Sequence, residues 1–245
     1  MDIGKATHLG NVRKINEDSF LVKESKGSFL LVVADGMGGH NAGEIASAMA
    51  VKNIEEYILN ENFKVDEERL SKALKFTNKT VFESADKQIR HRGMGTTVTA
   101  VFIKDSKACF ANVGDSRAYW MGDGELKQIT KDHSYVQMLV DQKVLTNEEA
   151  RFHPRRNLIT RAIGTTEKIE VDTFCCEFNE DDIILLCSDG LTSHVDDDFI
   201  KATLSENNSV DMQIKKLIDE ALKQGGSDNI TVLIAKQTPK AGDVQ

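Results

Sequence analysis

Short apolar segments rich in β-branched and aromatic residues recur along this chain, and they are the feature that most limits its fold. They lie at residues 18–24 (DSFLVKE), 28–34 (SFLLVVA), 95–103 (GTTVTAVFI) and 108–114 (ACFANVG). Side chains of these types favour strands. Residues 117–129 (RAYWMGDGELKQI) predict a hairpin, because an Asp-Gly step suits a tight turn. The segments predict antiparallel sheets.

Helical periodicity is present at residues 43–59 and 67–88 and again around residues 210–221, each time with one apolar stripe. In the second of these segments, Leu70, Leu74 and Val81 share a face. Strands in runs and helices in pairs, without strict β-α-β alternation, predict an α+β fold. We therefore expect helices packed over antiparallel sheets rather than a doubly wound parallel sheet.

The length of 245 residues, 40% of them hydrophobic, suits one large core. We expect one domain over residues 1–238, with a polar flap at about 131–165 and a polar tail at 239–245. The longest apolar run, residues 29–34, is far shorter than the roughly 20 residues that cross a bilayer. The first ten residues carry no apolar signal region. These features predict a cytoplasmic protein without membrane insertion.

The formal net charge of −8 argues against nucleic acid and anionic membranes as partners and favours a protein substrate. The cysteines show no C-x-x-C spacing and are interpreted as small buried hydrophobic residues: Cys109, Cys175, Cys176 and Cys187. None has an arginine six positions later. The loop with which a cysteine-dependent phosphatase holds phosphate is therefore missing.

Two segments of the chain share one plan, in which an apolar strand is followed by Asp-Gly and then by a histidine five residues after the aspartate. Asp35 and His40 occupy these positions in the first segment, and Asp189 and His194 occupy them in the second. Taken alone, each Asp-Gly pair predicts a turn. Further aspartates also lie at ends of strand-like segments: Asp18, Asp115 and Asp228.

If the sheets bring these strand ends together, the carboxylates repel one another unless cations neutralise them. Two divalent ions balance four carboxylates, and an all-oxygen donor set suits Mg²⁺ or Mn²⁺ better than zinc. Gly36 could add its carbonyl because no Cβ blocks close approach. A two-ion site serves displacement at phosphorus. Arg13, five residues before Asp18, could bind two phosphate oxygens, or it could be a solvated surface charge.

Seven motifs occur in order over residues 3–236: GNVRKINEDSF, VVADGMGGHNAGEIAS, GMGTTVTAVFI, ANVGDSRAY, LITRAIG, ILLCSDGLT and GGSDNITVLIA. Together they resemble the metal-dependent type 2C Ser/Thr protein phosphatases, most closely the compact bacterial members. The resemblance implies two antiparallel sheets in a central sandwich flanked by pairs of helices. It also implies hydrolysis of phosphoserine and phosphothreonine in proteins by a metal-bound hydroxide, without a phosphoenzyme.

Carried over by position, the resemblance implies roles for individual residues. The two core ions, Mn²⁺ or Mg²⁺, would be held by Asp35, the Gly36 carbonyl, Asp189 and Asp228, with Asp18 bound directly or through water. Glu17 would lie behind these ligands. Asp115 would form a third metal site with Asp189, and Arg13 would bind the phosphate. Phosphorylated proteins, including a Ser/Thr kinase, would be the partners of a monomeric enzyme.

One position departs from the pattern of animal relatives, where a histidine two residues after the first metal aspartate is thought to protonate the leaving oxygen. Met37 stands there in this chain. His40 is the nearest candidate general acid, but a water on a metal could serve as well, and His40 could instead hold the loop by hydrogen bonds. The other histidines are interpreted as polar surface or loop residues: His8, His91, His133, His153 and His194.

Three other functions remain open from the sequence. One is a phosphatase that acts on a single regulator of a partner-switching circuit, and another is an inactive metal-binding module that docks phosphoproteins. The third is a nucleotide-binding protein, which is disfavoured because the glycines around residue 38 match neither G-x-G-x-x-G nor a P-loop. In the flap, Arg155, Arg156 and Arg161 could meet acidic or phosphorylated partners, or they could belong to a solvated charged loop.

Overall fold

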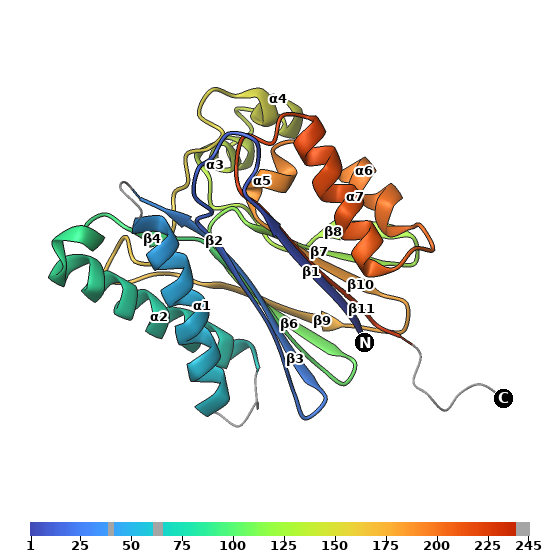
Figure 1. Ribbon diagram of the computed structural model, residues 1–245, viewed down its shortest axis with the longest axis horizontal. Coiled ribbons are helices and arrows are strands. Elements are labelled where there is room, and N and C mark those ends of the chain that lie inside the picture. The colour runs from blue at the N-terminus through green and yellow to red at the C-terminus, as the bar shows by residue number, and fades with distance from the viewer. Residues whose placement is uncertain (39–41, 61–65, 239–245) are drawn as a thin grey trace.

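The computed structural model describes residues 1–38, 42–60 and 66–238. Two antiparallel sheets face each other, and helices cover their outer faces (Figure 1). In spatial order the first sheet contains β1 (Asp2–His8), β11 (Ile230–Lys236), β10 (Ile183–Cys187), β7 (Arg117–Gly122) and β8 (Glu125–Gln128). The second contains β2 (Asp18–Ser25), β3 (Ser28–Met37), β5 (Val98–Lys104), β6 (Lys107–Val113) and β9 (Asp172–Glu177), and β4 (Gly95–Thr96) pairs with β3. The predicted α+β sandwich is confirmed.

The core has three layers because both faces of the sandwich are covered. Between the sheets, Leu31 and Val33 of β3 pack with residues of β10 and β11 such as Leu186 and Leu233. On the opposite face of the same strand, Leu30 and Val32 pack beneath the first helix pair. A strand that is buried on both faces needs apolar residues at every position. This explains the continuous apolar run at residues 29–34.

The helices flank the sandwich in groups. The second sheet is covered by α1 (Ala42–Asn60) and α2 (Glu67–Lys87), with the short helix η1 (Ile89–His91) after them. The first sheet is covered by α5 (Asp189–Thr192), α6 (Asp197–Leu204) and α7 (Val210–Lys223). The predicted stripes are buried, as Leu70, Leu74 and Val81 of α2 show.

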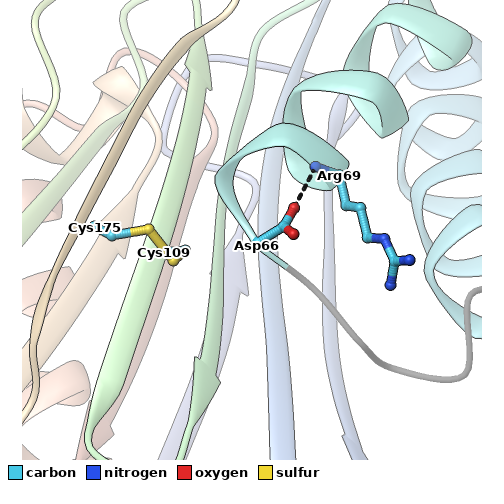
Figure 2. Close-up of a disulfide and its surroundings, with 4 residues drawn as sticks. All are labelled: Asp66, Arg69, Cys109 and Cys175. Atoms are coloured by element: carbon cyan, nitrogen blue, oxygen red, sulfur yellow. Dashed lines mark hydrogen bonds between the residues drawn. A yellow bond between two sulfur atoms is a disulfide. The ribbon is translucent and has the colours of Figure 1, made fainter.

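The start of α2 is set by a capping residue. The carboxylate of Asp66 accepts a hydrogen bond from the backbone N–H of Arg69 at 2.9 Å (Figure 2). Such a cap satisfies one of the N–H groups that the first turn of a helix leaves without a partner. The helix therefore begins at Glu67, as its periodicity predicts.

Two strand boundaries differ from the sequence prediction. The strand expected at 95–103 is split into β4 and β5, because the backbone N–H of Thr97 turns aside to bond the carbonyl of Asp35 at 2.8 Å. β3 does not end at Asp35 but continues to Met37, where it pairs with β4. The predicted hairpin is confirmed, with φ of 51° at Asp123 and 76° at Gly124, values that suit a tight hairpin turn.

Two of the four cysteines interpreted as small buried hydrophobic residues are joined by a disulfide, which that interpretation did not include. Cys109 on β6 and Cys175 on β9 stand opposite each other in the strand register and form a disulfide, with Cα atoms 4.1 Å apart (Figure 2). Their sulfur atoms lie between the sheet and the first helix pair. Cys187 is a buried free thiol, as expected, and Cys176 is a half-buried one.

The polar segment at 131–165 leaves the sandwich and carries α3 (Tyr135–Asp141) and α4 (Asn147–Phe152), which lie beside α5 in Figure 1. Ser134 caps α3, and Thr146 forms a capping box with Glu149 at the start of α4. A bridge between Thr96 and Ile163 rejoins the segment to β4. Among the described helices, none has the length and apolar character that a membrane crossing demands.

Candidate metal centre

The predicted aspartates meet at one end of the sandwich, and the strand pairing explains why. Asp18 on β2 stands directly opposite Asp35 on β3. Asp189 begins α5 immediately after β10, and Asp228 lies just before β11, the neighbour of β10. Adjacent strands of both sheets thus bring carboxylates from four parts of the sequence to the same end.

The electrostatics of this group follow from crowding like charges among protein atoms. The pKa of Asp35 is raised well above its ordinary value by burial, and then by the charges of Asp18, Asp189 and other carboxylates. Burial also raises the pKa of Asp18 to about 7, although hydrogen bonds from the hydroxyl groups of Thr231 and Ser188 partly oppose the shift. The fold therefore maintains an arrangement that repels negative charge.

The pKa values of Asp189 and Asp115 are raised as well. Burial and the charge of Asp228 raise the pKa of Asp189 to about 6, with a hydrogen bond to Asp35 acting in the opposite direction. Burial and then the charge of Asp189 raise the pKa of Asp115, which follows β6. Asp18, Asp35 and Asp189 each keep part of their surface open to solvent, so ligands can reach them.

These residues fit a hard divalent cation. The Oδ1 atoms of Asp18 and Asp189 are buried and lack a hydrogen-bond partner within the described part of the chain, and such oxygens are costly unless a donor or a cation meets them. The donors are all oxygen, as Mg²⁺ and Mn²⁺ prefer. In the ranges that the structure describes, no group of three or more His, Cys, Asp or Glu side chains is arranged so that it could hold a metal ion, so the fit rests on the donor chemistry and on the two oxygens without partners.

The glycines that follow two of these aspartates allow a close backbone approach. A Cβ on Gly36 would lie 2.1 Å from the carbonyl oxygen of Gly43, and one on Gly190 would lie 1.9 Å from the carbonyl oxygen of Asn229. Gly36 lies inside β3, and Gly190 lies in the first turn of α5. The interpretation of Asp-Gly as a turn is therefore wrong at both places: each glycine permits two backbone segments to touch.

Arg13 reaches the rim of the carboxylate group. Its Nη2 donates to Oδ2 of Asp228 at 2.7 Å, and 48% of its side chain is exposed. The hydrogen bond to Asp228 is the main cause that raises the pKa of this arginine. Arg13 is thus held beside the site rather than being an isolated surface charge.

Comparison with known proteins decides the family. The sequence model of the family Protein phosphatase 2C matches residues 7–228. The chain belongs to the protein phosphatase 2C family. It is 39% identical over 236 residues to the serine/threonine phosphatase Stp of Listeria welshimeri, with 94% of each chain covered. It is 40% identical over 226 residues to the serine/threonine protein phosphatase PstP of Mycobacterium tuberculosis, covering 92% of this chain and 43% of that protein.

Solved structures agree with this assignment. The catalytic domain of PstP in complex with two manganese ions superposes with a TM-score of 0.86 at 36% identity, covering 97% of this chain and 98% of that one. The resemblance to bacterial type 2C phosphatases in the sequence motifs is confirmed. The two-manganese complex of that relative agrees with the metal dependence expected of the family.

Asn229 is a residue of this phosphatase that the sequence analysis did not single out. Its Nδ2 donates to the carbonyl oxygens of Leu9 at 2.9 Å and Ile15 at 3.1 Å, and its Oδ1 accepts from the N–H of Glu17 at 2.8 Å. The side chain thereby fastens the segment that carries Arg13 to the segment that carries Asp228. Its position directly after Asp228 was the one available signal in the sequence.

Glu17 supports the site through its backbone. Its carbonyl accepts hydrogen bonds from the N–H of Gly36 at 3.0 Å and from the hydroxyl of Ser47 at 2.6 Å. Burial raises the pKa of its carboxyl group. Glu17 therefore ties the start of β2 to β3 and α1 beside the aspartates.

The histidines of the phosphatase have separate outcomes. His40, the candidate general acid, lies outside the described residues, whereas Met37 is the last residue of β3. His194 bonds Ser227 in a loop, which agrees with its interpretation as a loop residue. His133 lies in a loop, as interpreted, but it is buried rather than on the surface: its Nδ1 accepts the N–H of Gly114, the residue before Asp115.

Proposed function

We propose that this chain hydrolyses phosphoserine and phosphothreonine in proteins with bound divalent metal, by direct attack of water on phosphorus. The observation that carries the proposal is the group of crowded aspartates with raised pKa values and buried oxygens without partners, beside Arg13. Its agreement with a family of protein phosphatases supports the same conclusion.

In this proposal Asp35, the Gly36 carbonyl, Asp189 and Asp228 hold two ions, Mn²⁺ or Mg²⁺, with Asp18 bound directly or through water. When bound, such ions lower the pKa of water and stabilise negative charge on phosphate oxygens. The hydroxyl groups of Ser188 and Thr231 orient Asp18 by donating to its Oδ2 at 2.8 and 2.6 Å. Asp115 with Asp189 forms a third metal site.

Arg13 orients the substrate phosphate. In the described part of the chain, the hydrogen bonds of its side chain use Nη2, so the other nitrogen donors of the guanidinium remain available to phosphate oxygens. A planar arginine fork binds two such oxygens at once and offsets the charge that grows on them during transfer. Asn229 keeps this arginine in place through the backbone of residues 9–17.

The leaving serine or threonine oxygen needs a proton. His40 is our candidate donor, and a water in the site is the alternative. We further propose that the chain works as a monomer in the cytoplasm on phosphorylated proteins, including a Ser/Thr kinase. The family supports these partners, because Ser/Thr phosphatases hydrolyse the phosphate esters that such kinases form.

The test is hydrolysis of a phosphothreonine peptide in EDTA, Mg²⁺ or Mn²⁺, by the unmodified chain and by Asp189→Asn. Asp219→Asn is the matched control, because Asp219 is an exposed aspartate paired with Lys215 on α7. We expect activity that needs added metal, falls at least about a hundredfold in Asp189→Asn and is unchanged in the control. Activity that is indifferent to EDTA would contradict the mechanism. Metal binding without turnover would favour the docking module.

A further inference from the structure

We propose that the cleft between the flap and α5–α6 binds an anionic side chain of the phosphopeptide, through Arg151 and Arg156. The anion is either a carboxylate or a second phosphate on the same peptide. This inference rests on the proposed function, because it assigns a substrate class to the same site.

The cleft is a continuation of the carboxylate site. It has a volume of about 750 Å³, and Asp115 and Asp189 line it together with residues of the flap and of α5–α6. A peptide whose phosphate lies at the aspartates therefore has this cleft next to it. Neighbouring residues of the peptide would enter it.

The flap wall of the cleft carries charges of both signs, whereas the wall at the start of α6 is acidic. The flap contributes Lys131, Arg151 and Arg156 together with Asp132 and Glu148, and the start of α6 contributes Asp196, Asp197 and Asp198. An anion is repelled by the acidic wall and attracted by the arginines of the flap. A side chain that enters the cleft is thus sorted by its charge.

Two aspartates of the acidic wall already accept hydrogen bonds from other residues of the chain. Asp196 caps α6 by accepting the N–H of Phe199 at 2.8 Å, and Asp197 accepts the hydroxyl of Tyr119 at 3.0 Å. On the flap wall, Lys131 is paired with Asp141 at 2.7 Å. No ion pair of Arg151 or Arg156 is found among the described residues. These two arginines are the cations of the cleft left for a ligand.

The structure also separates these residues from the other arginines of the flap. Arg155 stacks over the ring of Tyr135 at 5.8 Å from its centroid, and Arg161 bonds Asp172 at 2.7 Å. Neither lines the cleft, whereas Arg156 does. The sequence left open whether the three flap arginines meet anionic partners or belong to a solvated loop; among them Arg156 lines the cleft, and Arg151 joins it.

Contacts on the sandwich side fix the cleft relative to the aspartates. Arg117 holds Asp132 with two nitrogens, at 2.7 and 3.0 Å, and its Nη1 donates to Tyr119 at 3.0 Å. The N–H of Gly114 donates to His133 at 3.0 Å. Because these contacts tie the flap to β7 and to the loop of Asp115, Arg151 and Arg156 stand at a set distance from the scissile phosphate. The preference for an anionic side chain should therefore apply to peptide positions on one side of the phosphorylated residue.

The experiment measures kcat/KM for a phosphothreonine peptide in which a single Asp replaces Ala at successive positions on either side. A second series carries phosphoserine in place of Asp, and a third carries Lys. For each enzyme the readout is the ratio of kcat/KM for the substituted peptide to kcat/KM for the Ala peptide. We expect a ratio of about three to ten over adjacent positions on one side for anions, and below one for Lys.

The Arg151→Gln/Arg156→Gln double variant should bring this ratio to about one, whereas Arg155→Gln, the matched control, should keep it. The ratio should also fall as salt is added. A preference for phosphoserine without one for Asp would identify the ligand as a second phosphate, and a preference for both would identify a general anion site.

The inference would be overturned by a kcat/KM ratio that is the same at every peptide position or by a preference for Lys. A preference for anions that survives in the double variant would also overturn it. Loss of the ratio in Arg155→Gln to the same extent would overturn it as well. Failure of the proposed function is a separate outcome, since the Ala peptide would then not be hydrolysed at all with Mg²⁺ or Mn²⁺.

Discussion

The carboxylate site and the flap cleft are neighbours in this phosphatase, but the charged residues of the first are surrounded by protein and those of the second are exposed. The aspartates of the site stand on or beside paired strands, surrounded by protein, and repel one another. The arginines of the cleft stand on a short helix and the turn after it, exposed to solvent. In our two proposals the core holds the charges that do the chemistry, whereas the surface holds those that select the substrate.

The largest expected effect is on the site side of this comparison. Asp35→Asn should lower phosphopeptide turnover at least about a hundredfold. The same change should raise the unfolding temperature in EDTA, because it removes a charge that burial and neighbouring carboxylates disfavour. Turnover and thermal unfolding measured on one preparation test both. A variant that is less stable without metal would show that the carboxylates do not repel one another.

The backbone beneath the site should tolerate little change. Gly190→Ala would place a Cβ 1.9 Å from the carbonyl oxygen of Asn229, so we expect a loss of about 3 kcal/mol in the free energy of unfolding. Gly93→Ala is the control, with φ of +78° and open space, and should cost about 1 kcal/mol. Urea titration measures both. Equal losses in the free energy of unfolding would show that the site tolerates an added Cβ as well as the surface does.

A pH series should sharpen the electrostatic half of the comparison. The folded pKa values of Asp18, about 7, and Asp189, about 6, lie above the ordinary aspartate value of 3.8. The folded state therefore binds more protons than the unfolded state between about pH 4 and pH 7, and stability falls as pH rises through that window. In EDTA we expect the free energy of unfolding to be larger at pH 5 than at pH 7 by about 1 kcal/mol or more.

Saturating Mn²⁺ provides the control for that series, because a cation that binds the carboxylates favours their ionised form. With Mn²⁺ the stability should rise with pH over the same window. The same falling dependence with and without Mn²⁺ would mean that the ions bind elsewhere.

The smallest effect is expected on the flap side. Arg161→Ala removes the ion pair with Asp172, whose side chains are 28% and 51% exposed. Global stability should fall by no more than about 1 kcal/mol. Hydrogen exchange at residues 131–160 should increase, while exchange in β3 should not. A global loss of several kcal/mol would show that the flap is part of the cooperative core, and Arg155→Ala is the matched control.

Local sequence signals were sufficient where one element decides the structure. The apolar stripe of α2, its start after Asp66 and the hairpin at Asp123 were predictable, since caps and turns depend on neighbouring residues. The strand pairing was not predictable from the sequence. Two features that depend on it were therefore not predicted. One is the disulfide between Cys109 and Cys175, and the other is the contact that requires Gly190.

The residues of the candidate site likewise divide into those that the sequence predicted and those that it did not. Asp18, Asp35, Asp115, Asp189 and Asp228 were found from their places at strand ends and from the family resemblance. Asn229 was missed and the backbone contact of His133 was not predicted, because a side chain that holds distant backbone segments carries no local pattern. The sequence left the role of the flap arginines open, and only the structure distinguishes Arg156, which lines the cleft, from Arg155 and Arg161.

By itself, the sequence determined the fold class, the family and the residue types of the site, because periodicity and ordered motifs are properties of the chain in its own order. Only the tertiary structure decided which carboxylates face one another, which glycines accept a second backbone and which arginines line the cleft. Those relations join residues far apart in the chain, and the pairing of strands in two facing sheets sets their distances.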